Sequence, residues 1–269
     1  MKNKFFTREF VPRHKYRRLR ERQGDFMRII FIRHGDPDYK NDRLTEKGHR
    51  EAKLLSERTA GWENITQIYC SPLGRARETA YYTLEKLGKE AVTYPWLQEF
   101  SYTVDDPTTD RHGVPWDFMP EYWTEIDAMY DKKGWRETEI YRSNPELLPA
   151  YDEVCAGIDS VLAEYGYQRY HNYYKTTHTK TPDGQDYTLV FFCHLGVSCV
   201  MMSHLLGISP VVLFHGLYLA PTCLTIFASE ERIPGKAIFR AQVIGDTTHL
   251  HDGQEPVSAM GYFTDVFQK

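Results

Sequence analysis

The chain of 269 residues is 41% hydrophobic and 26% charged, with a formal net charge of −4, which is ordinary for a soluble globular protein. No apolar run approaches the roughly 20 residues that a membrane-spanning helix needs, and the basic N-terminus is not followed by the apolar segment of a secretory signal. An odd number of cysteines without paired spacing predicts reduced thiols: Cys70, Cys155, Cys193, Cys199 and Cys223. We therefore expect a cytoplasmic protein of one large or two small domains.

Residues 1–22 differ in charge from the rest of the chain. They hold nine Lys and Arg against two Glu, a local charge of +7, which leaves −11 for the remainder. A basic arm can bind nucleic acid or an anionic membrane, although many charge runs are simply solvated. We interpret residues 1–26 as a solvated extension without either partner, with Met27 as an alternative start, and residues 27–269 as the folded domain.

The first predicted strand is the apolar run from Ile29 to Ile32. Its β-branched and aromatic residues, bounded by charged residues, are typical of a buried parallel strand. Arg33, His34 and Gly35 follow it directly. Ligands of open α/β sheets bind just outside the carboxyl ends of such strands, so these residues begin a candidate site.

Helices and strands alternate after a polar loop at residues 36–43. A helix is expected from Thr45, a suitable N-cap, to about residue 59, because its apolar residues keep helical spacing. A strand, a helix and a strand are then predicted at residues 65–70, 75–87 and 91–97. Glu99 comes directly after this third strand.

Residues 101–145 interrupt the alternation. This segment is rich in aromatic residues and holds ten acids against five Lys and Arg, a net charge of −5. Long elaborations of compact domains are usually functional lids or disordered, and the aromatic density argues against disorder. We expect a helical or irregular lid that lies over the rim of the sheet.

The second half returns to helices and strands. A long helix is predicted at 146–165 with Gly166 as its stop, followed by an exposed loop or small hairpin at 167–187 that contains a Pro182-Asp-Gly184 turn. The remaining strands are expected at 188–193, 223–228 and 237–244, with a buried helix from about 195 to 206. The pattern predicts an α/β fold with three layers, α/β/α, in which a mainly parallel sheet with some antiparallel edge carries helices on both faces.

Polar side chains gather at or near the ends of the predicted strands: Arg33, His34, Arg75, Glu99 and His194. Two Arg, two His and one Glu describe a site for a tetrahedral dianion, because guanidinium groups match phosphate oxygens bidentately. The helix after His194 would direct its N-terminal N–H groups, those of Leu195 and Gly196, toward the same anion.

Each of these residues also has a structural interpretation: Arg75 as a surface residue, Glu99 as a solvated strand end, and His194 as a core histidine. Their joint occurrence favours one site. Three other carboxylates remain alternatives to Glu99 as a proton donor: Glu78, Asp36 and Asp105.

A metal site is the other chemistry that two histidines and carboxylates suggest. His34 and His194 lack the helical spacing of paired ligands, and their Arg neighbours repel cations. We therefore expect no metal and no other cofactor. His249 is assigned to fixing the sheet or a loop rather than to the phosphate site.

Six short motifs occur in a fixed order: Arg33-His-Gly35, Leu44-Thr-Glu-Lys-Gly48, Ser71-Pro-Leu-Gly-Arg-Ala-Arg-Glu-Thr-Ala80, Leu97-Gln-Glu99, Cys193-His-Leu-Gly196 and Asp246-Thr-Thr-His-Leu250. In this set the chain resembles the histidine phosphatase superfamily, also called phosphoglycerate-mutase-like, over about residues 27–255. The resemblance implies that His34 accepts the phosphoryl group and that Glu99 donates a proton. It also implies that Arg33, Arg75 and His194 bind the phosphoryl oxygens.

Two departures from the family pattern bear on the reaction. Members with mutase activity usually continue Arg-His-Gly with Glu-Ser and a Trp-Asn pair, where this chain has Asp36-Pro-Asp-Tyr-Lys-Asn41, and this favours hydrolysis. Many members have Gly after the second histidine, where Leu195 adds bulk.

We therefore expect a phosphatase acting on a small phosphomonoester. The acidic, aromatic insertion favours a neutral, cationic or planar remainder over a polyanion. A phosphoglycerate mutase and a non-catalytic module that binds a phosphorylated ligand stay as alternatives.

Overall fold

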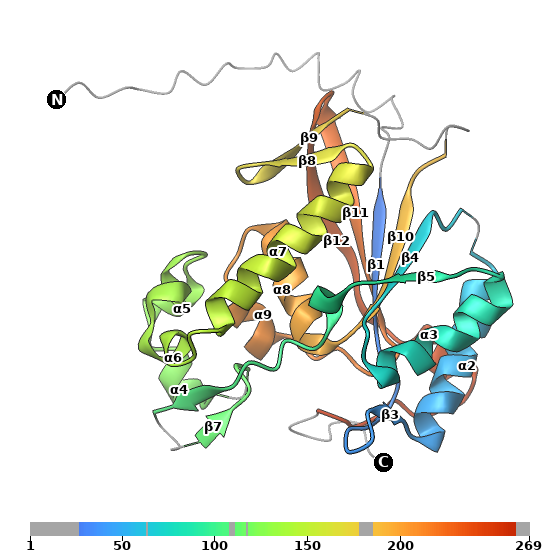
Figure 1. Ribbon diagram of the computed structural model, residues 1–269, viewed down its shortest axis with the longest axis horizontal. Coiled ribbons are helices and arrows are strands. Elements are labelled where there is room, and N and C mark those ends of the chain that lie inside the picture. Colours follow the sequence, from blue (N-terminus) through green and yellow to red (C-terminus); the bar gives the residue numbers. More distant parts are fainter. Residues whose placement is uncertain (1–26, 63, 108–110, 117, 178–184, 262–269) are drawn as a thin grey trace.

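An eight-stranded sheet forms the centre of the molecule (Figure 1), with the strand order β5-β4-β10-β1-β11-β12-β9-β8. The computed structural model describes residues 27–261 except 63, 108–110, 117 and 178–184. The first four strands of the sheet are parallel: β5 (Ala91–Thr93), β4 (Gln67–Cys70), β10 (Thr188–Cys193) and β1 (Arg28–Arg33). The other four are antiparallel: β11 (Leu224–Ile233), β12 (Lys236–Asp246), β9 (Tyr173–Thr176) and β8 (Tyr167–Tyr170).

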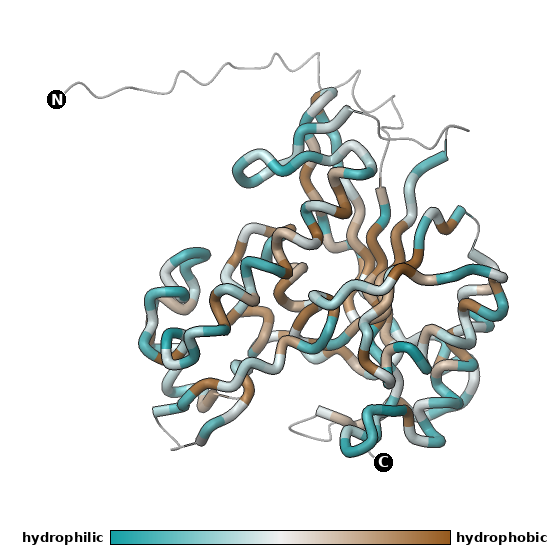
Figure 2. The backbone as a smooth tube through the Cα atoms, in the orientation of Figure 1, coloured by the Kyte–Doolittle hydropathy of each residue, from teal (hydrophilic) through white to brown (hydrophobic). Residues whose placement is uncertain are grey.

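The side chains of the central strands alternate between two cores. Ile29 and Phe31 of β1 lie in one core, and Ile30 and Ile32 lie in the other. All six residues of β10 are buried, and Figure 2 shows these central strands as the most hydrophobic part of the tube. Because both faces of the sheet are covered, the sequences of these central strands are continuous apolar runs.

Helices cover both faces, which confirms the predicted three layers (Figure 1). One face carries α2 (Glu46–Ala60) and α3 (Gly74–Leu87), with α10 (Thr248–Asp252) packed against α2. The other face carries α7 (Leu147–Glu164), α8 (Leu195–Leu206) and α9 (Pro210–Gly216). No helix among the described residues is long and apolar enough to cross a membrane.

The predicted helix boundaries are confirmed where the sequence holds a capping residue. The side chain of Thr45 accepts a hydrogen bond from the N–H of Gly48 at the start of α2. Gly166, just after α7, has a φ of 82°, a left-handed conformation that ends helices and suits glycine.

The insertion at 101–145 consists of two short paired strands, β6 (Val104–Asp106) and β7 (Arg111–Gly113), and of short helical segments. These segments are α4 (Pro120–Trp123), α5 (Asp127–Tyr130), η2 (Gly134–Glu137) and α6 (Glu139–Arg142). They lie outside α7 and α9, at the end of the molecule where β1 finishes (Figure 1). Trp135 and Tyr141 are buried, so part of the aromatic content forms a core for the insertion.

Two predicted segments differ from the structure. The strand expected at 91–97 ends at Thr93, and Pro95–Leu97 forms the 3₁₀ helix η1, because Pro95 has no N–H to donate to a neighbouring strand. The segment after α7 forms the β8–β9 hairpin, which confirms the expected small hairpin, but this hairpin extends the sheet and its Tyr167 and Tyr174 are buried rather than exposed. The Pro182-Asp-Gly184 turn and residues 1–26 lie outside the described residues.

The five cysteines are free thiols, and all are buried. Burial raises the pKa of each thiol, so at neutral pH each remains a protonated, apolar core group.

Candidate active site

The parallel pairing of β1 and β10 brings the two predicted histidines together. Arg33 pairs with Cys193 at the carboxyl ends of these strands, so the next residue of each strand, His34 and His194, lies at the same edge. The centroids of the two imidazole rings are 5.1 Å apart. Arg75 enters the same site from the first turn of α3.

Four buried polar atoms at this edge have no hydrogen-bond partner among the described residues: Arg33 Nε, His34 Nε2, Arg75 Nε and His194 Nδ1. Their residues are at most 8% exposed. An unsatisfied buried polar group costs about 1–3 kcal/mol, and native proteins leave few of them. A cluster of four therefore indicates a site built to receive a polar ligand.

The ring of His34 is oriented by its own backbone. Its Nδ1 lies 2.8 Å from the carbonyl oxygen of Gly35, and a carbonyl only accepts, so Nδ1 carries the proton and Nε2 carries a lone pair. Burial, and then the positive charges of Arg33 and Arg75, hold the pKa of His34 well below its usual value. His34 is therefore a neutral imidazole with a free nitrogen directed into the cluster.

Each arginine of the site is held at one end of its guanidinium group. Nη1 of Arg33 donates to the carbonyl oxygen of Leu219 at 2.5 Å, and Nη1 of Arg75 donates to Oδ1 of Asp42 at 2.5 Å. The other carboxylate oxygen of Asp42 accepts the N–H of Gly74 at 2.7 Å. This anchoring leaves the Nε side of both groups for an anion, and that side binds oxygens bidentately.

His194 is fixed by a different partner. Its Nε2 lies 2.8 Å from Oγ of Ser71, which is fully buried after β4. Burial and the neighbouring His34, Arg75 and Arg33 lower the pKa of His194 well below its usual value. The second histidine is therefore also neutral.

Glu99 lies against the N-terminus of α8. Its Oε1 accepts the N–H groups of Phe100 and Gly196 at 2.8 Å and of Val197 at 3.2 Å. Burial raises the pKa of Glu99 against the opposing effect of these hydrogen bonds and of the nearby arginines. The predicted N–H of Gly196 thus binds Glu99, whereas the N–H of Leu195 has no partner among the described residues.

Gly196 is required by close packing at this point. A Cβ atom on it would lie 2.8 Å from Oε1 of Glu99 and 2.6 Å from Cζ3 of Trp116. Trp116 comes from the insertion and packs on Phe214 of α9 with a centroid separation of 5.8 Å. The insertion therefore contributes an aromatic side chain beside the carboxyl group of Glu99.

A second aromatic side chain borders the site from the loop after β1. The ring of Tyr39 lies 5.3 Å from the Arg75 guanidinium carbon and 6.2 Å from the His34 ring centroid, and Tyr39 is 54% exposed. We did not select Tyr39, Trp116, Asp42 or Ser71 from the sequence. Two signals were available: Ser71 opens the motif that contains Arg75, and Trp116 belongs to the aromatic insertion.

The alternative carboxylates are engaged elsewhere. Asp36 accepts hydrogen bonds from two hydroxyl groups, Glu78 from a backbone N–H of β3 (Arg43–Leu44), and Asp105 from the ring of an exposed histidine. Arg33 and Arg75 of the site lower the pKa of Glu99 against the larger, raising effect of its burial.

His249 contacts the backbone of the site through Thr222. Its Nε2 lies 3.0 Å from Oγ1 of Thr222, whose N–H contacts the carbonyl oxygens of Arg33 and His34 at 3.1 and 3.2 Å. Burial lowers the pKa of His249 to about 4. The position agrees with the expectation that His249 fixes a loop.

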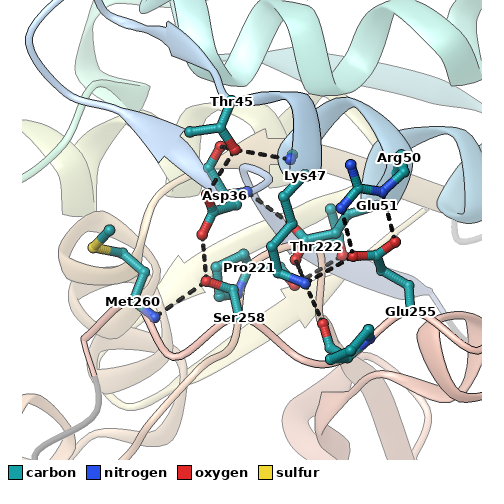
Figure 3. Close-up of polar contacts among 12 residues, drawn as sticks. Asp36, Thr45, Lys47, Arg50, Glu51, Pro221, Thr222, Glu255, Ser258 and Met260 are labelled. Atoms are coloured by element: carbon teal, nitrogen blue, oxygen red, sulfur yellow. Dashed lines mark hydrogen bonds and ion pairs between the residues drawn. The ribbon is translucent and has the colours of Figure 1, made fainter.

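The loop after Gly35 is held by segments that are distant in sequence (Figure 3). The N–H of Asp36 donates to Oε2 of Glu51 at 2.8 Å, and its Oδ1 accepts from Oγ of Ser258 at 2.5 Å. Glu255 of the same C-terminal segment pairs with Lys47 of α2 at 2.9 Å. These contacts fix the backbone that orients His34.

The residues of the cluster suit an anion better than a metal ion, because two guanidinium groups border both histidines. Among the described residues, no three His, Cys, Asp or Glu side chains are placed together to hold a metal ion.

A family model of the histidine phosphatase superfamily (branch 1) matches residues 29–235. The chain belongs to this superfamily. A probable phosphoglycerate mutase of Serratia proteamaculans is 30% identical over 82 residues, which are 27% of this chain and 38% of that protein. The chain thus spans less than two fifths of the length of the curated relatives it matches.

Solved histidine phosphatase folds are similar over most of the chain. A phosphoserine phosphatase from Entamoeba histolytica in complex with phosphoserine has a TM-score of 0.54 at 18% identity, covering 83% of this chain and 99% of its own. A putative alpha-ribazole-5'-P phosphatase from Escherichia coli K-12 has a TM-score of 0.53 at 16% identity, covering 82% and 97%. At these identities the likeness establishes the fold.

Proposed function

We propose that this histidine phosphatase is a metal-independent phosphatase that hydrolyses a small phosphomonoester through a phosphohistidine on His34. The observation that carries the proposal is the cluster of four unpartnered buried atoms. Three of them are nitrogens of Arg33, Arg75 and His194 placed to bind oxygens, and the fourth is the lone pair of His34 Nε2. Together these atoms offer the groups that bind phosphoryl oxygens and the nucleophile that attacks phosphorus.

In the first step the lone pair of His34 Nε2 attacks phosphorus, and the bond from phosphorus to the ester oxygen breaks. Negative charge spreads over the equatorial oxygens of the phosphoryl group. Arg33, Arg75, His194 and the N–H of Leu195 stabilise this charge. Glu99, whose pKa is raised by burial, acts as the general acid and gives a proton to the leaving alkoxide. The arginines supply the positive charge that a metal ion supplies in other phosphatases.

In the second step a water molecule attacks the phosphohistidine. The Glu99 carboxylate accepts a proton from that water, the bond from nitrogen to phosphorus breaks, and inorganic phosphate leaves. The electron pair returns to His34 Nε2, and Glu99 is again protonated for the next cycle. One residue thus serves as acid and then as base.

A phosphoglycerate mutase is the second candidate, and the observation that favours it is the name of the relative from Serratia proteamaculans. The sequence between Gly35 and Thr45 lacks the Glu-Ser and Trp-Asn of mutases. Incubation with 3-phosphoglycerate and bisphosphoglycerate would produce 2-phosphoglycerate if the protein is a mutase.

The phosphatase is tested with para-nitrophenyl phosphate in the presence of a chelator. Wild-type protein is expected to release para-nitrophenol and to form an acid-labile, alkali-stable phosphoenzyme. His34→Ala is expected to lose the phosphoenzyme and roughly 10³-fold or more of the activity. Activity that needs an added divalent cation, or a phosphoenzyme that survives in His34→Ala, would contradict the proposal.

A further inference from the structure

The hydroxyl group of Ser71 has only one acceptor among the described residues. Its Oγ accepts the N–H of Leu73 at 3.2 Å and lies 2.8 Å from Nε2 of His194. Ser71 is 0% exposed, so its hydroxyl hydrogen needs a partner inside the protein. That hydrogen therefore points at Nε2 of His194.

This direction of the hydrogen bond fixes the tautomer of His194. If Nε2 accepts from Ser71, the proton of a neutral ring must sit on Nδ1. Nδ1 is the buried atom of His194 that has no partner among the described residues, and the ring that carries it lies 5.1 Å from the ring of His34, centroid to centroid. In the other tautomer Nδ1 would present a lone pair to a phosphate oxygen, and the two would repel.

We propose that Ser71 is a positioning residue that holds His194 in its Nδ1–H form, so that a neutral imidazole donates a hydrogen bond to the phosphoryl oxygens. This inference rests on the proposed function. The Nδ1–H tautomer gives His194 a hydrogen-bond donor without a positive charge. His34 and His194 can therefore both be neutral although they are neighbours. Ser71 acts through His194 and touches no substrate.

The test compares Ser71→Ala and Ser71→Thr with wild type, using inorganic phosphate as a competitive inhibitor and para-nitrophenyl phosphate as substrate between about pH 4.5 and 8. At neutral pH, Ser71→Ala is expected to bind phosphate about tenfold more weakly and to lose about 10- to 100-fold in kcat/KM. Ser71→Thr keeps the hydroxyl and should recover most of both.

The pH dependence separates positioning from a general structural effect. Protonation of His194 puts a hydrogen on both ring nitrogens, so the defect of Ser71→Ala is expected to shrink toward acid pH. The charged and titratable groups around this ring are Arg33 at the end of β1, His34 directly after it, and Arg75 from α3, and all three are unchanged in the variant.

Ser198→Ala is the matched control. Ser198 is also a buried serine against His194, but its Oγ donates to the backbone carbonyl of His194 at 2.6 Å. Ser198→Ala should show any general loss of stability, but its difference from wild type in activity and phosphate binding should not change with pH. An equal defect of Ser71→Ala at every pH, or the same pH-dependent difference in Ser198→Ala, would overturn the inference. If wild type bound phosphate but formed no phosphoenzyme, the proposed function would fail while the Ser71 comparison could still be read.

Discussion

The two oxygens of Glu99 have different surroundings, and this sets the chemistry of the residue. Oε1 accepts three backbone N–H groups, including those of Gly196 and Val197, whereas Oε2 has no hydrogen bond among the described residues. Donors gathered on Oε1 favour the proton on Oε2. The raised pKa of the carboxyl group then keeps an acid available above the usual range of glutamate.

Glu99→Gln is expected to affect phosphomonoesters according to their leaving groups. Phosphoenzyme formation from an alkyl ester such as glycerol 2-phosphate should slow by about 10²- to 10³-fold, because an alkoxide leaves poorly without a proton. Formation from para-nitrophenyl phosphate should slow by less than about tenfold. Single-turnover measurement isolates this step from the later attack of water.

The pH dependence of phosphoenzyme formation is an independent test of whether Glu99 acts as an acid. Its acid form disappears as pH rises through a pKa that burial holds above the usual value, so wild-type phosphoenzyme formation from the alkyl ester should fall with rising pH. Glu99→Gln should lack this alkaline decline. A uniform loss for both esters at all pH values would show that Glu99 is structural.

The residue scale is also where sequence motifs and structure agree most closely. Arg33, His34, Arg75 and His194 were selected from their places at strand ends, and the structure brings them together. Asp42 could not be found this way, because its role depends on a left-handed backbone with a φ of 49° that turns its carboxylate toward the start of α3. A loop conformation of that kind leaves no pattern in one sequence.

At the scale of secondary-structure elements, the insertion at 101–145 determines what lies beside Glu99. The leaving group must be near the acid that protonates it, and Trp116 lies against the same glycine as Glu99. Trp116 is half-buried. We therefore expect the insertion to offer an aromatic surface to the alcohol part of the ester.

Trp116→Ala is expected to change substrate preference rather than chemistry. The ratio of kcat/KM for phenyl phosphate over glycerol 2-phosphate should fall about two- to twelvefold, since one aromatic contact stabilises by about 0.5–1.5 kcal/mol. Trp116→Phe should retain most of the preference. Trp123→Ala is the control, because Trp123 of the insertion stacks on His215 of α9; an equal change of the ratio in this variant would contradict the assignment.

The element scale shows why pattern predicts some segments and not others. β10 and β1 were found because burial on both faces produces continuous apolar runs. The β8–β9 hairpin was not placed in the sheet, because its segment is otherwise polar. Tyr174 is buried where it pairs with Ala237 of β12, and Tyr167 is buried against the ring of Phe239 on the same strand. Tertiary pairing outweighs local polarity there.

At the scale of the whole molecule, the C-terminal segment of the described chain packs beside the site. The C-terminal segment at 255–260 contacts α2 and the loop after β1 (Figure 3). Glu51 lies inside this junction, fully buried, with Oε2 bonded to the N–H of Asp36 and Oε1 3.5 Å from Nζ of Lys47. No sequence pattern reveals such a junction, because its partners are about 200 residues apart.

Glu51 makes the stability of the whole fold dependent on pH. Burial raises its pKa from 4.5 to about 7, so folding favours the protonated form. Its contribution is fully present below pH 4.5 and is lost as pH rises to about 7, a change of up to about 3 kcal/mol. Glu51→Gln keeps a neutral acceptor for Asp36 and avoids the buried charge.

The variant should therefore match wild type near pH 4.5 and become more stable by about 1–3 kcal/mol above pH 7, measured as the free energy of unfolding in urea. Glu57→Gln on the same helix is the control, because Glu57 is largely exposed and its ion pair with Lys86 lies at the surface; its effect should stay within about 0.5 kcal/mol at every pH. A difference between Glu51→Gln and wild type that did not grow from pH 4.5 to 7 would mean that Glu51 stays charged in the fold. In that case the ion pair with Lys47, and not a neutral carboxyl group of Glu51, would stabilise the contact of the C-terminal segment with α2 and the loop after β1.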